Sequence, residues 1–342
     1  MSDKVLVTGV SGFIASHVTE RLLNQGYNVR GTVRNLKKGE RVKKVFADTG
    51  LDVSRLELVQ ADLGSDVGWK EAVQGCRYIQ HIASPLPHEA PKDREALVPE
   101  ARAGAQRVLE HGFSAGAERI VLTSSIAAMM GQAGKGAEMI ITDDDWSDPD
   151  WKPMTSYPIS KTRAEQSAWA YATAQGLKDK LTVVNPGVVF GPDTYGNAGA
   201  SLGMLKAMMI GKFPRAPKVG VPLIDVRDCA AIHVQAMTAE AAGGRRLLAT
   251  GQTLWFKEIA SVLKEAYPEL KSLPKGEMPS FVLRVLAVFD DSIRPLLTEL
   301  GTYHIADAAY VTNLTGVVPR SAKEAILAGA ESLIASGSVR LG

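Results

Sequence analysis

Residues 4–15 read KVLVTGVSGFIA, an apolar run that leads into a glycine-rich turn. Beyond the turn, apolar residues recur at helical spacing, at Phe13, Ile14, Val18 and Leu22. This pattern predicts a buried strand that passes through a tight turn into a helix. The backbone N–H groups and the dipole at the start of such a helix can bind the pyrophosphate of a dinucleotide.

The turn has the spacing GxxGxxA, with Gly9, Gly12 and Ala15, and not the GxGxxG of the common dinucleotide fingerprint. Gly9 permits the tight turn, Gly12 lets the backbone approach the phosphates, and the small Ala15 lets helix and strand pack closely. The position directly after a strand favours a dinucleotide site that includes Phe13 and Ile14. The alternative is a glycine-rich turn that only closes a strand–helix unit.

Composition and charge limit the classes of function. The chain has 342 residues, 45% hydrophobic and 22% charged, with a net charge of +2. This charge gives no reason to expect binding to nucleic acid or to a membrane, and no apolar run is long enough to span a bilayer. Cys76 and Cys229 indicate neither a disulfide framework nor a metal site, and no signal peptide is recognisable. We therefore expect a soluble, cytoplasmic protein without a metal ion.

Strand and helix patterns alternate in the first half of the chain. Strands are expected at 27–33, 56–59, 78–83, 119–123 and 181–184, and helices at 36–47, 66–73, 95–113 and 156–175. This alternation predicts an α/β fold, with a doubly wound parallel sheet of the Rossmann type.

Beyond residue 190 the chain contains more loops. A strand is expected at 221–226, and helices at 228–237, 254–266, 279–289 and 321–335, the last beginning with a capping box. We expect residues 1–190, with further core elements from about 221–250, to form an NADP-binding domain. Residues 191–342 should contribute mainly a smaller substrate-binding lobe, interleaved with that core.

The residues after the second expected strand indicate the cofactor. An NAD site places Asp or Glu there to bond the 2′-hydroxyl of the adenosine ribose. Here Arg34, Lys37 and Lys38 follow the strand, and a guanidinium can bind a 2′-phosphate through two hydrogen bonds. Arg34 and Lys38 therefore favour NADPH or NADP+ over NADH, unless both are only solvated. Asp62 can bond the adenine amino group, although a turn or capping role explains it equally well.

Tyr157 and Lys161 carry the candidate chemistry. They lie four residues apart at the start of an expected helix, so their side chains share a face. An ammonium group beside a tyrosine moves its pKa from about 10 toward a range useful for proton transfer. Chance produces this spacing in many helices, but here Thr123-Ser124-Ser125 also ends the fifth strand. A hydroxyl there can hold a carbonyl oxygen while Tyr157 protonates it; the alternative is a capping or turn role.

Taken together, these motifs resemble the extended short-chain dehydrogenase/reductase superfamily. The resemblance covers roughly residues 3–335, and the chain looks most like the dihydroflavonol 4-reductase group and its microbial aldehyde, ketone and methylglyoxal reductase relatives. It rests on TGVSGFIA at 8–15, Arg34, Ala61-Asp62-Leu63, His81-Ile82-Ala83-Ser84, Thr123-Ser124-Ser125, Tyr157-x-x-Ser160-Lys161, Asn185-Pro186-Gly187, Gly191-Pro192 and Asp225-Val226-Arg227-Asp228.

The resemblance implies a role for each matching residue. Ser125 would orient the substrate carbonyl, Tyr157 would donate the proton, and Lys161 would bond the nicotinamide ribose. Besides Tyr157 and Lys161, the cofactor contacts implied are Gly9, Gly12, Phe13, Ile14, Ala15, Arg34, Lys38, Asp62, Leu63, Ala83, Ser84, Thr123, Pro186, Val188 and Ser201. The implied reaction is the NADPH-dependent, reversible reduction of a ketone or aldehyde to an alcohol, in a monomer or homodimer with a small-molecule substrate.

Two residues depart from the family pattern. Pro158 directly follows Tyr157 and biases it away from the helical region, and Asn185 stands where many relatives have Arg. Other features lack a match: Trp146 and Trp151 fit either pocket walls or packing, and the Met-rich run 202–210 fits either an apolar wall or core. The loops expected to shape the pocket are 85–94, 126–156, 190–222 and 275–310.

Two other functions compete with the reductase. A nucleotide-sugar epimerase or dehydratase shares the scaffold but would retain NAD, which Arg34 and Lys38 argue against. A non-catalytic NADP-sensing protein would keep the fold without Ser125, Tyr157 and Lys161, all of which are present here.

Overall fold

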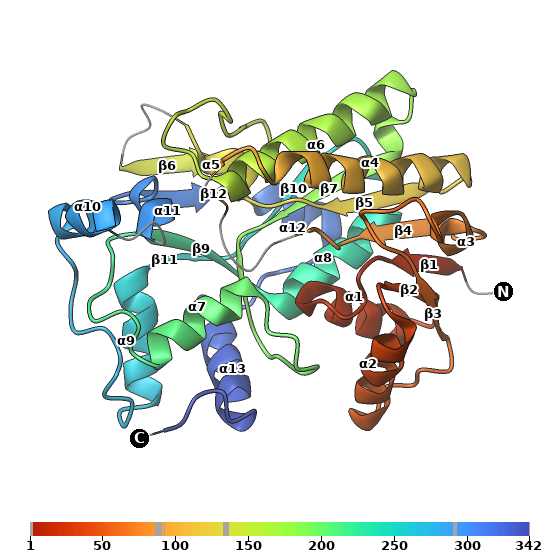
Figure 1. The fold of residues 1–342 in the computed structure, drawn as a ribbon. Coiled ribbons are helices and arrows are strands. Elements are labelled where there is room, and N and C mark those ends of the chain that lie inside the picture. Colours follow the sequence, from red (N-terminus) through yellow and green to blue (C-terminus); the bar gives the residue numbers. More distant parts are fainter. Residues whose placement is uncertain (1–2, 86–90, 92, 133–136, 290–292, 342) are drawn as a thin grey trace.

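Figure 1 shows the computed structural model of the chain, which describes residues 3–85, 91, 93–132, 137–289 and 293–341. A seven-stranded sheet with the order β10-β7-β5-β4-β1-β2-β3 forms its centre, and every neighbouring pair of strands is parallel. The strands are β1 (Lys4–Val7), β2 (Asn28–Val33), β3 (Leu56–Gln60), β4 (Tyr78–His81), β5 (Arg119–Thr123), β7 (Leu181–Pro186) and β10 (Arg246–Ala249). The strand order reverses between β1 and β4, which opens a crevice for a ligand at their carboxyl ends.

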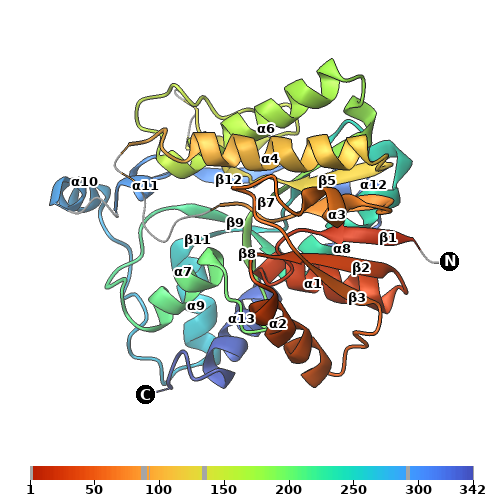
Figure 2. The same cartoon turned by 45° about the vertical axis from the view of Figure 1, so that its right-hand side comes forward.

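Helices cover both faces of this sheet, and Figure 2 shows α4 and α6 on one side with α1 and α8 on the other. The helices on the first face are α3 (Trp69–Val73), α4 (Val98–Ser114) and α6 (Ser156–Ala174), and those on the second include α1 (Phe13–Asn24), α2 (Leu36–Asp48) and α8 (Val226–Thr238). Neighbouring strand residues alternate between two cores: Val183 joins the core under α4 and α6, and Val184 the core under α1 and α8. The predicted doubly wound α/β fold is thus confirmed.

The rest of the chain builds two smaller sheets beside the main one (Figure 1). One has the order β11-β9-β8 and the other pairs β12 with β6. Their strands are β6 (Glu138–Ile141), β8 (Val188–Phe190), β9 (Gly220–Asp225), β11 (Thr253–Trp255) and β12 (Tyr303–Ala306). The accompanying helices are α5 (Ala127–Met130), α7 (Ala200–Met209), α9 (Phe256–Ala266), α10 (Ser280–Phe289), α11 (Arg294–Leu297), α12 (Ala309–Thr315) and α13 (Ala322–Ala335), with 3-10 turns η1 (Lys178–Lys180) and η2 (Glu240–Ala242).

Several expected boundaries were wrong for local reasons. The helix expected at 66–73 begins only at Trp69, because Gly68 before it has a φ of +86°, outside the helical region. The helix expected at 254–266 begins at Phe256, because the preceding residues pair with β9 as β11. The predicted capping box of α13 is present, with Ser321 Oγ accepting the N–H of Glu324.

The Met-rich run 202–210 mostly forms core. In α7, Leu202, Leu205, Met208 and Met209 are at most 1% exposed. The core alternative therefore holds for these four residues. The expected pocket loops fall partly outside the described residues, namely at 86–90, 92, 133–136 and 290–292.

Candidate active site

The glycine-rich turn connects β1 to α1 as the sequence predicts. Gly9 has a φ of +65°, in the left-handed region, and a Cβ there would lie 2.9 Å from the Cβ of Ala83. Gly12 is the N-cap of α1, and its N–H donates to the carbonyl of Gly9 at 2.8 Å. Both the backbone conformation and the close approach of Ala83 therefore require glycine at position 9.

The first turn of α1 supplies hydrogen-bond donors. The N–H groups of residues 13–15 have no acceptor within the helix, because an α-helix leaves its first N–H groups unpaired. By contrast, the N–H of Gly9 donates to Thr32 Oγ1 at 2.9 Å. A diphosphate at this helix end would thus meet Phe13, Ile14 and Ala15, together with the positive end of the dipole.

Two cations, Arg34 and Lys38, lie near the end of β2, where the sequence predicts the adenosine ribose of a dinucleotide. Arg34 directly follows β2, and Lys38 lies in the first turn of α2. Both are exposed, and within the described part of the chain neither side chain has a hydrogen bond or an ion pair. Asn35 caps the helix by accepting the N–H of Lys38 at 3.2 Å. An anion here would meet two free cations and a helix N-terminus.

Asp62 has the turn role that the sequence leaves open. Its Oδ1 accepts the N–H of Gly64 at 2.8 Å, and its backbone carbonyl accepts the Trp69 Nε1–H at 2.9 Å. The carboxylate is exposed, so a ligand can still reach it. Its contact with adenine stays a prediction.

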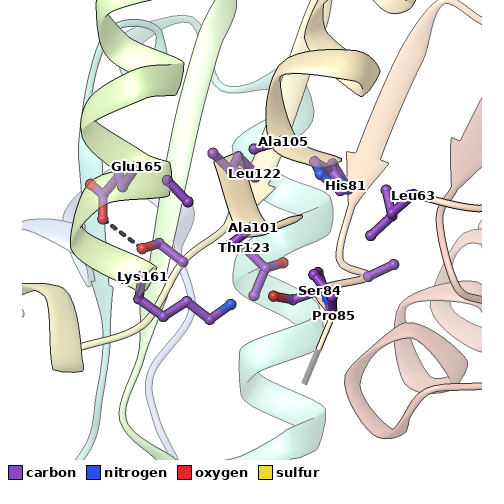
Figure 3. A pocket seen from close by; sticks show the side chains of 13 residues that line it. Leu63, His81, Ser84, Pro85, Ala101, Ala105, Leu122, Thr123, Lys161 and Glu165 are labelled. Atoms are coloured by element: carbon purple, nitrogen blue, oxygen red, sulfur yellow. Dashed lines mark hydrogen bonds between the residues drawn. The ribbon is translucent and has the colours of Figure 1, made fainter. Parts of the chain in front are cut away.

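A small cavity, open to solvent, lies at the carboxyl ends of β4 and β5 (Figure 3). It brings together five predicted cofactor residues, Leu63, Ala83, Ser84, Thr123 and Lys161. The lining is completed by His81, Pro85, Ala101, Ala105, Leu122, Ser124, Ala164 and Glu165. Segments far apart in the sequence therefore meet at the carboxyl edge of the sheet, one strand along from the point where the strand order reverses.

Tyr157 and Lys161 lie on one face of α6, in its first two turns. The Nζ of Lys161 is 6.0 Å from the centroid of the Tyr157 ring. Pro158 does not interrupt the helix, because it lies in the first turn, where a backbone N–H would have no helical acceptor. Ser125 is 9% exposed, and its Oγ accepts the N–H of Ala127 at 3.1 Å, which leaves the hydroxyl proton for another acceptor.

Pro186, Val188 and Ser201 do not line this cavity. Pro186 ends β7, Val188 begins β8, and Ser201 Oγ in the first turn of α7 accepts the N–H of Val189 at 3.3 Å. Their contacts with a cofactor stay predictions.

The two tryptophans have packing roles. Trp146 lies under the guanidinium of Arg246, whose Cζ is 3.8 Å from the centroid of the Trp146 ring. Trp151 packs beside Val98, Met154 and Ile159. These contacts agree with the packing alternative for both.

A buried histidine, His81, lies beside the cavity with its protonation fixed by geometry. Thr8 Oγ1 accepts the N–H groups of Ile82 and Ala83 at 3.0 Å each, so its own proton points to His81 Nδ1, also at 3.0 Å. The imidazole therefore accepts at Nδ1 and carries its proton at Nε2. Burial, with a smaller effect of the nearby Lys161 charge, lowers the pKa of His81 to about 3.

A second buried histidine, His233, orients Thr123. Its Nδ1–H donates to the carbonyl of Cys229 at 2.8 Å, so Nε2 accepts the hydroxyl of Thr123, also at 2.8 Å. Burial lowers the pKa of His233 to about 4, which keeps the ring neutral. The Thr123 hydroxyl can then only accept a hydrogen bond from a ligand in the cavity. No local sequence signal marks this pair, because 110 positions separate the two residues.

Because these two histidines are buried and neutral, we expect the protein to lose stability in mild acid. In the folded protein both rings stay neutral, whereas in the unfolded chain each takes up a proton near pH 6.5. Protonation therefore favours the unfolded chain, and the stability present above pH 6.5 is lost as the pH falls below it. From pH 7 to pH 5 the two together should lower the free energy of unfolding by about 3–4 kcal/mol. Denaturant titrations at pH 7 and at pH 5 measure this difference in the free energy of unfolding. His81→Asn, which keeps an acceptor for Thr8, should remove about half of this loss.

The matched control is His111→Asn, in the partly exposed face of α4. It should leave the pH dependence nearly unchanged. An H81N protein with the same loss between pH 7 and pH 5 as the wild type would contradict the assignment.

One residue that lines the cavity is a buried carboxylate, Glu165, which no motif in the sequence singles out. Glu165 of α6 is 1% exposed and forms an ion pair with Arg246 of β10, with Nε to Oε1 at 2.5 Å. Asn185, the residue that departs from the family pattern, is fully buried and donates to Glu165 and to the Ser125 carbonyl. Glu165 lies four residues after Lys161, so helical geometry could have indicated that it shares a face with that lysine. No residue near Arg246 in the sequence indicates the ion pair with Glu165.

Two further features bear on the class of protein. Among the residues that the structure describes, no cluster of His, Cys, Asp and Glu could hold a metal ion. In the described parts of the chain, no helix is both long enough and apolar enough to span a bilayer.

Comparisons with known proteins identify the family of the chain. The model of the NAD dependent epimerase/dehydratase family matches residues 5–248. Cinnamoyl-CoA reductase 1 of Arabidopsis thaliana is 34% identical over 267 residues, 78% of this chain and 75% of the relative. Tetraketide alpha-pyrone reductase 2 of the same plant is 34% identical over 273 residues, 78% of this chain and 83% of the relative.

A solved structure extends the likeness over nearly the whole chain. Yeast methylglyoxal/isovaleraldehyde reductase Gre2, complexed with NADPH, matches with a TM-score of 0.81 at 25% identity, over 98% of this chain and 100% of the yeast chain. The family model alone covers more than half of the sequence. The chain therefore belongs to the NAD dependent epimerase/dehydratase family, within the extended short-chain dehydrogenase/reductases.

Proposed function

We propose that this protein is an NADPH-dependent reductase that converts a ketone or aldehyde to an alcohol and can run in reverse. One observation carries the proposal: the cavity at the ends of β4 and β5 joins Lys161 to the predicted cofactor residues, with Tyr157 on the same helical face. The free N–H groups of α1 suit the diphosphate. The unpaired Arg34 and Lys38 suit a 2′-phosphate. The likeness to an NADPH-bound yeast reductase supports the same cofactor.

The chain's own residues then orient and protonate the substrate. NADPH, when bound, supplies the hydride. The free hydroxyl proton of Ser125 donates to the carbonyl oxygen and holds it for attack. Tyr157 transfers its phenolic proton to that oxygen as negative charge develops on it. Lys161 bonds the ribose hydroxyls, and its ammonium stabilises the phenolate that remains on Tyr157.

An epimerase or dehydratase that retains NAD is the second candidate, because the matching family model carries that description. Such a site needs a carboxylate for the ribose 2′-hydroxyl at the end of β2. Instead, Arg34 directly follows β2 and Lys38 lies in the adjoining helix turn. These two cations favour the NADPH-dependent reductase.

Cofactor oxidation with a panel of carbonyl compounds tests the proposal. The panel holds aliphatic and aryl ketones, aldehydes, ketoesters and a dihydroflavonol, each with NADPH and with NADH. Turnover with NADPH on any of them supports the reductase and ranks its substrates. Absence of turnover with either cofactor on the whole panel would overturn it in favour of the epimerase or of a cofactor-sensing protein.

A further inference from the structure

A buried ion pair lies one helical turn beyond Lys161 on α6. The side chain of Glu165 is fully buried, and that of Arg246 is 7% exposed. Two guanidinium nitrogens contact the carboxylate, Nε to Oε1 at 2.5 Å and a terminal nitrogen to Oε2 at 3.4 Å. Because burial strips both ions of water, removal of either one leaves the other uncompensated.

Neutral donors complete the surroundings of the Glu165 carboxylate. Ser124 Oγ donates to Oε2 at 2.6 Å and Asn185 Nδ2 at 2.9 Å, while Trp169 Nε1 donates to Oε1 at 3.3 Å. Asn185 Nδ2 also donates to the backbone carbonyl of Ser125 at 3.2 Å. The carboxylate therefore holds the segment directly after β5, which carries the Ser125 hydroxyl.

Arg246 uses its remaining donors on the segment between β6 and α6. One terminal nitrogen donates to the carbonyl of Asp143 at 3.1 Å and also to the carbonyl of Asp145. The guanidinium plane covers Trp146. With these contacts Arg246 has a fixed position, and it cannot move toward the cavity without breaking several hydrogen bonds.

Lys161 lies one helical turn before Glu165, a spacing at which a lysine and a glutamate on one helix pair readily. Nevertheless, among the described residues Lys161 has no hydrogen bond or ion pair. Figure 3 shows its amine pointing into the cavity and away from Glu165, which instead bonds Ser124. The other group facing Lys161 across the cavity is His81, which is neutral.

We propose that Arg246 is a positioning residue that occupies the Glu165 carboxylate and so leaves Lys161 free for the cofactor ribose and for Tyr157. Without Arg246, an uncompensated carboxylate would lie one turn from the Lys161 ammonium and attract it toward Glu165, away from the position where it can bond the cofactor ribose. The inference rests on the proposed function, since it assigns Lys161 to the NADPH ribose. It further assigns Arg246, a residue of β10, a role in setting the position of the Lys161 side chain.

The test compares Arg246→Met with the double variant Arg246→Met/Glu165→Gln. In R246M we expect the dissociation constant for NADPH, measured by fluorescence titration, to rise about tenfold or more, as one lost charged hydrogen bond would produce. The pH profile of kcat should move to higher pH, because an added negative charge disfavours the phenolate. The double variant carries no stray carboxylate and should bind NADPH within about threefold of the wild type.

Two further variants separate positioning from stability. Glu165→Gln leaves a positive charge behind Lys161, so its kcat profile should move to lower pH, opposite to R246M. Arg246→Lys keeps the charge and should keep the wild-type profile, even if R246M proves too unstable to purify. Arg320→Met is the matched control, because Arg320 pairs with the buried Asp228 and neither residue lines the cavity. It should cost stability without changing NADPH affinity.

The outcomes are decisive in both directions. Shifts of R246M and E165Q in opposite directions, with recovery in the double variant, support the proposal. Two results would contradict it: pH profiles of kcat that move in the same direction or not at all, and a double variant that binds NADPH no better than R246M. Either result would mean that the Glu165–Arg246 pair has only a structural role. The NADPH titration needs no carbonyl substrate. A wild type that binds NADPH but reduces nothing would therefore defeat the proposed function while the binding arm still decides the role of Arg246.

Discussion

Tyr157→Phe is expected to lower kcat/KM for NADPH-dependent carbonyl reduction by about 10²–10⁴-fold, the usual contribution of a positioned proton donor. The substitution removes only the phenolic oxygen, and the ring keeps its place in the first turn of α6. The dissociation constant for NADPH should change by less than about threefold, because Lys161 remains beside the cavity. Steady-state kinetics and a fluorescence titration measure the two quantities on the same preparation.

The matched control is Tyr171→Phe, a tyrosine of the same helix that packs against the core away from the cavity. Its kcat/KM should stay close to the wild type. If Y157F and Y171F have similar activities, Tyr157 is not the proton donor. A large loss of NADPH affinity in Y157F would instead indicate a role in binding.

Features formed by neighbours in the sequence were predictable. The turn with Gly9 and Gly12 follows from spacing alone, because a strand, a turn and a helix are formed by consecutive residues. The shared face of Tyr157 and Lys161 follows from helical geometry for the same reason. Both predictions concern residues whose relative positions the local backbone conformation determines.

Features formed by distant residues were not predictable from pattern. β10 is only four residues long, so the sequence indicates further core elements at about 221–250 but not that a strand there completes the main sheet beside β7. Arg246 of β10 meets Glu165 across 81 positions of the sequence. The charge of each residue is evident from the sequence, but only the packed sheet brings the two ions together, since isolated buried charges are too costly to persist.

Arg34→Asp is expected to reverse the choice between the two nicotinamide cofactors. Arg34 is exposed and without a partner among the described residues, so its loss should cost the fold little. A bidentate guanidinium–phosphate contact comprises two charged hydrogen bonds, and replacing it with a carboxylate adds repulsion. The dissociation constant for NADPH should therefore rise about 10²–10³-fold. NADH has a 2′-hydroxyl that a carboxylate can accept from, so its affinity should hold or improve.

The control is Arg41→Asp, which introduces the same change of charge further along α2, at another exposed arginine. A general effect of charge would weaken NADPH binding equally in both variants, whereas a direct 2′-phosphate contact confines the loss to Arg34. If R34D weakens NADPH and NADH alike, the residue acts on the backbone around β2 and not on the phosphate. If it changes neither affinity, the cofactor preference lies elsewhere and the argument against an NAD-retaining epimerase loses its main support. If R34D instead loses affinity for NADPH but not for NADH, Arg34 contacts the 2′-phosphate, the group that distinguishes the two cofactors.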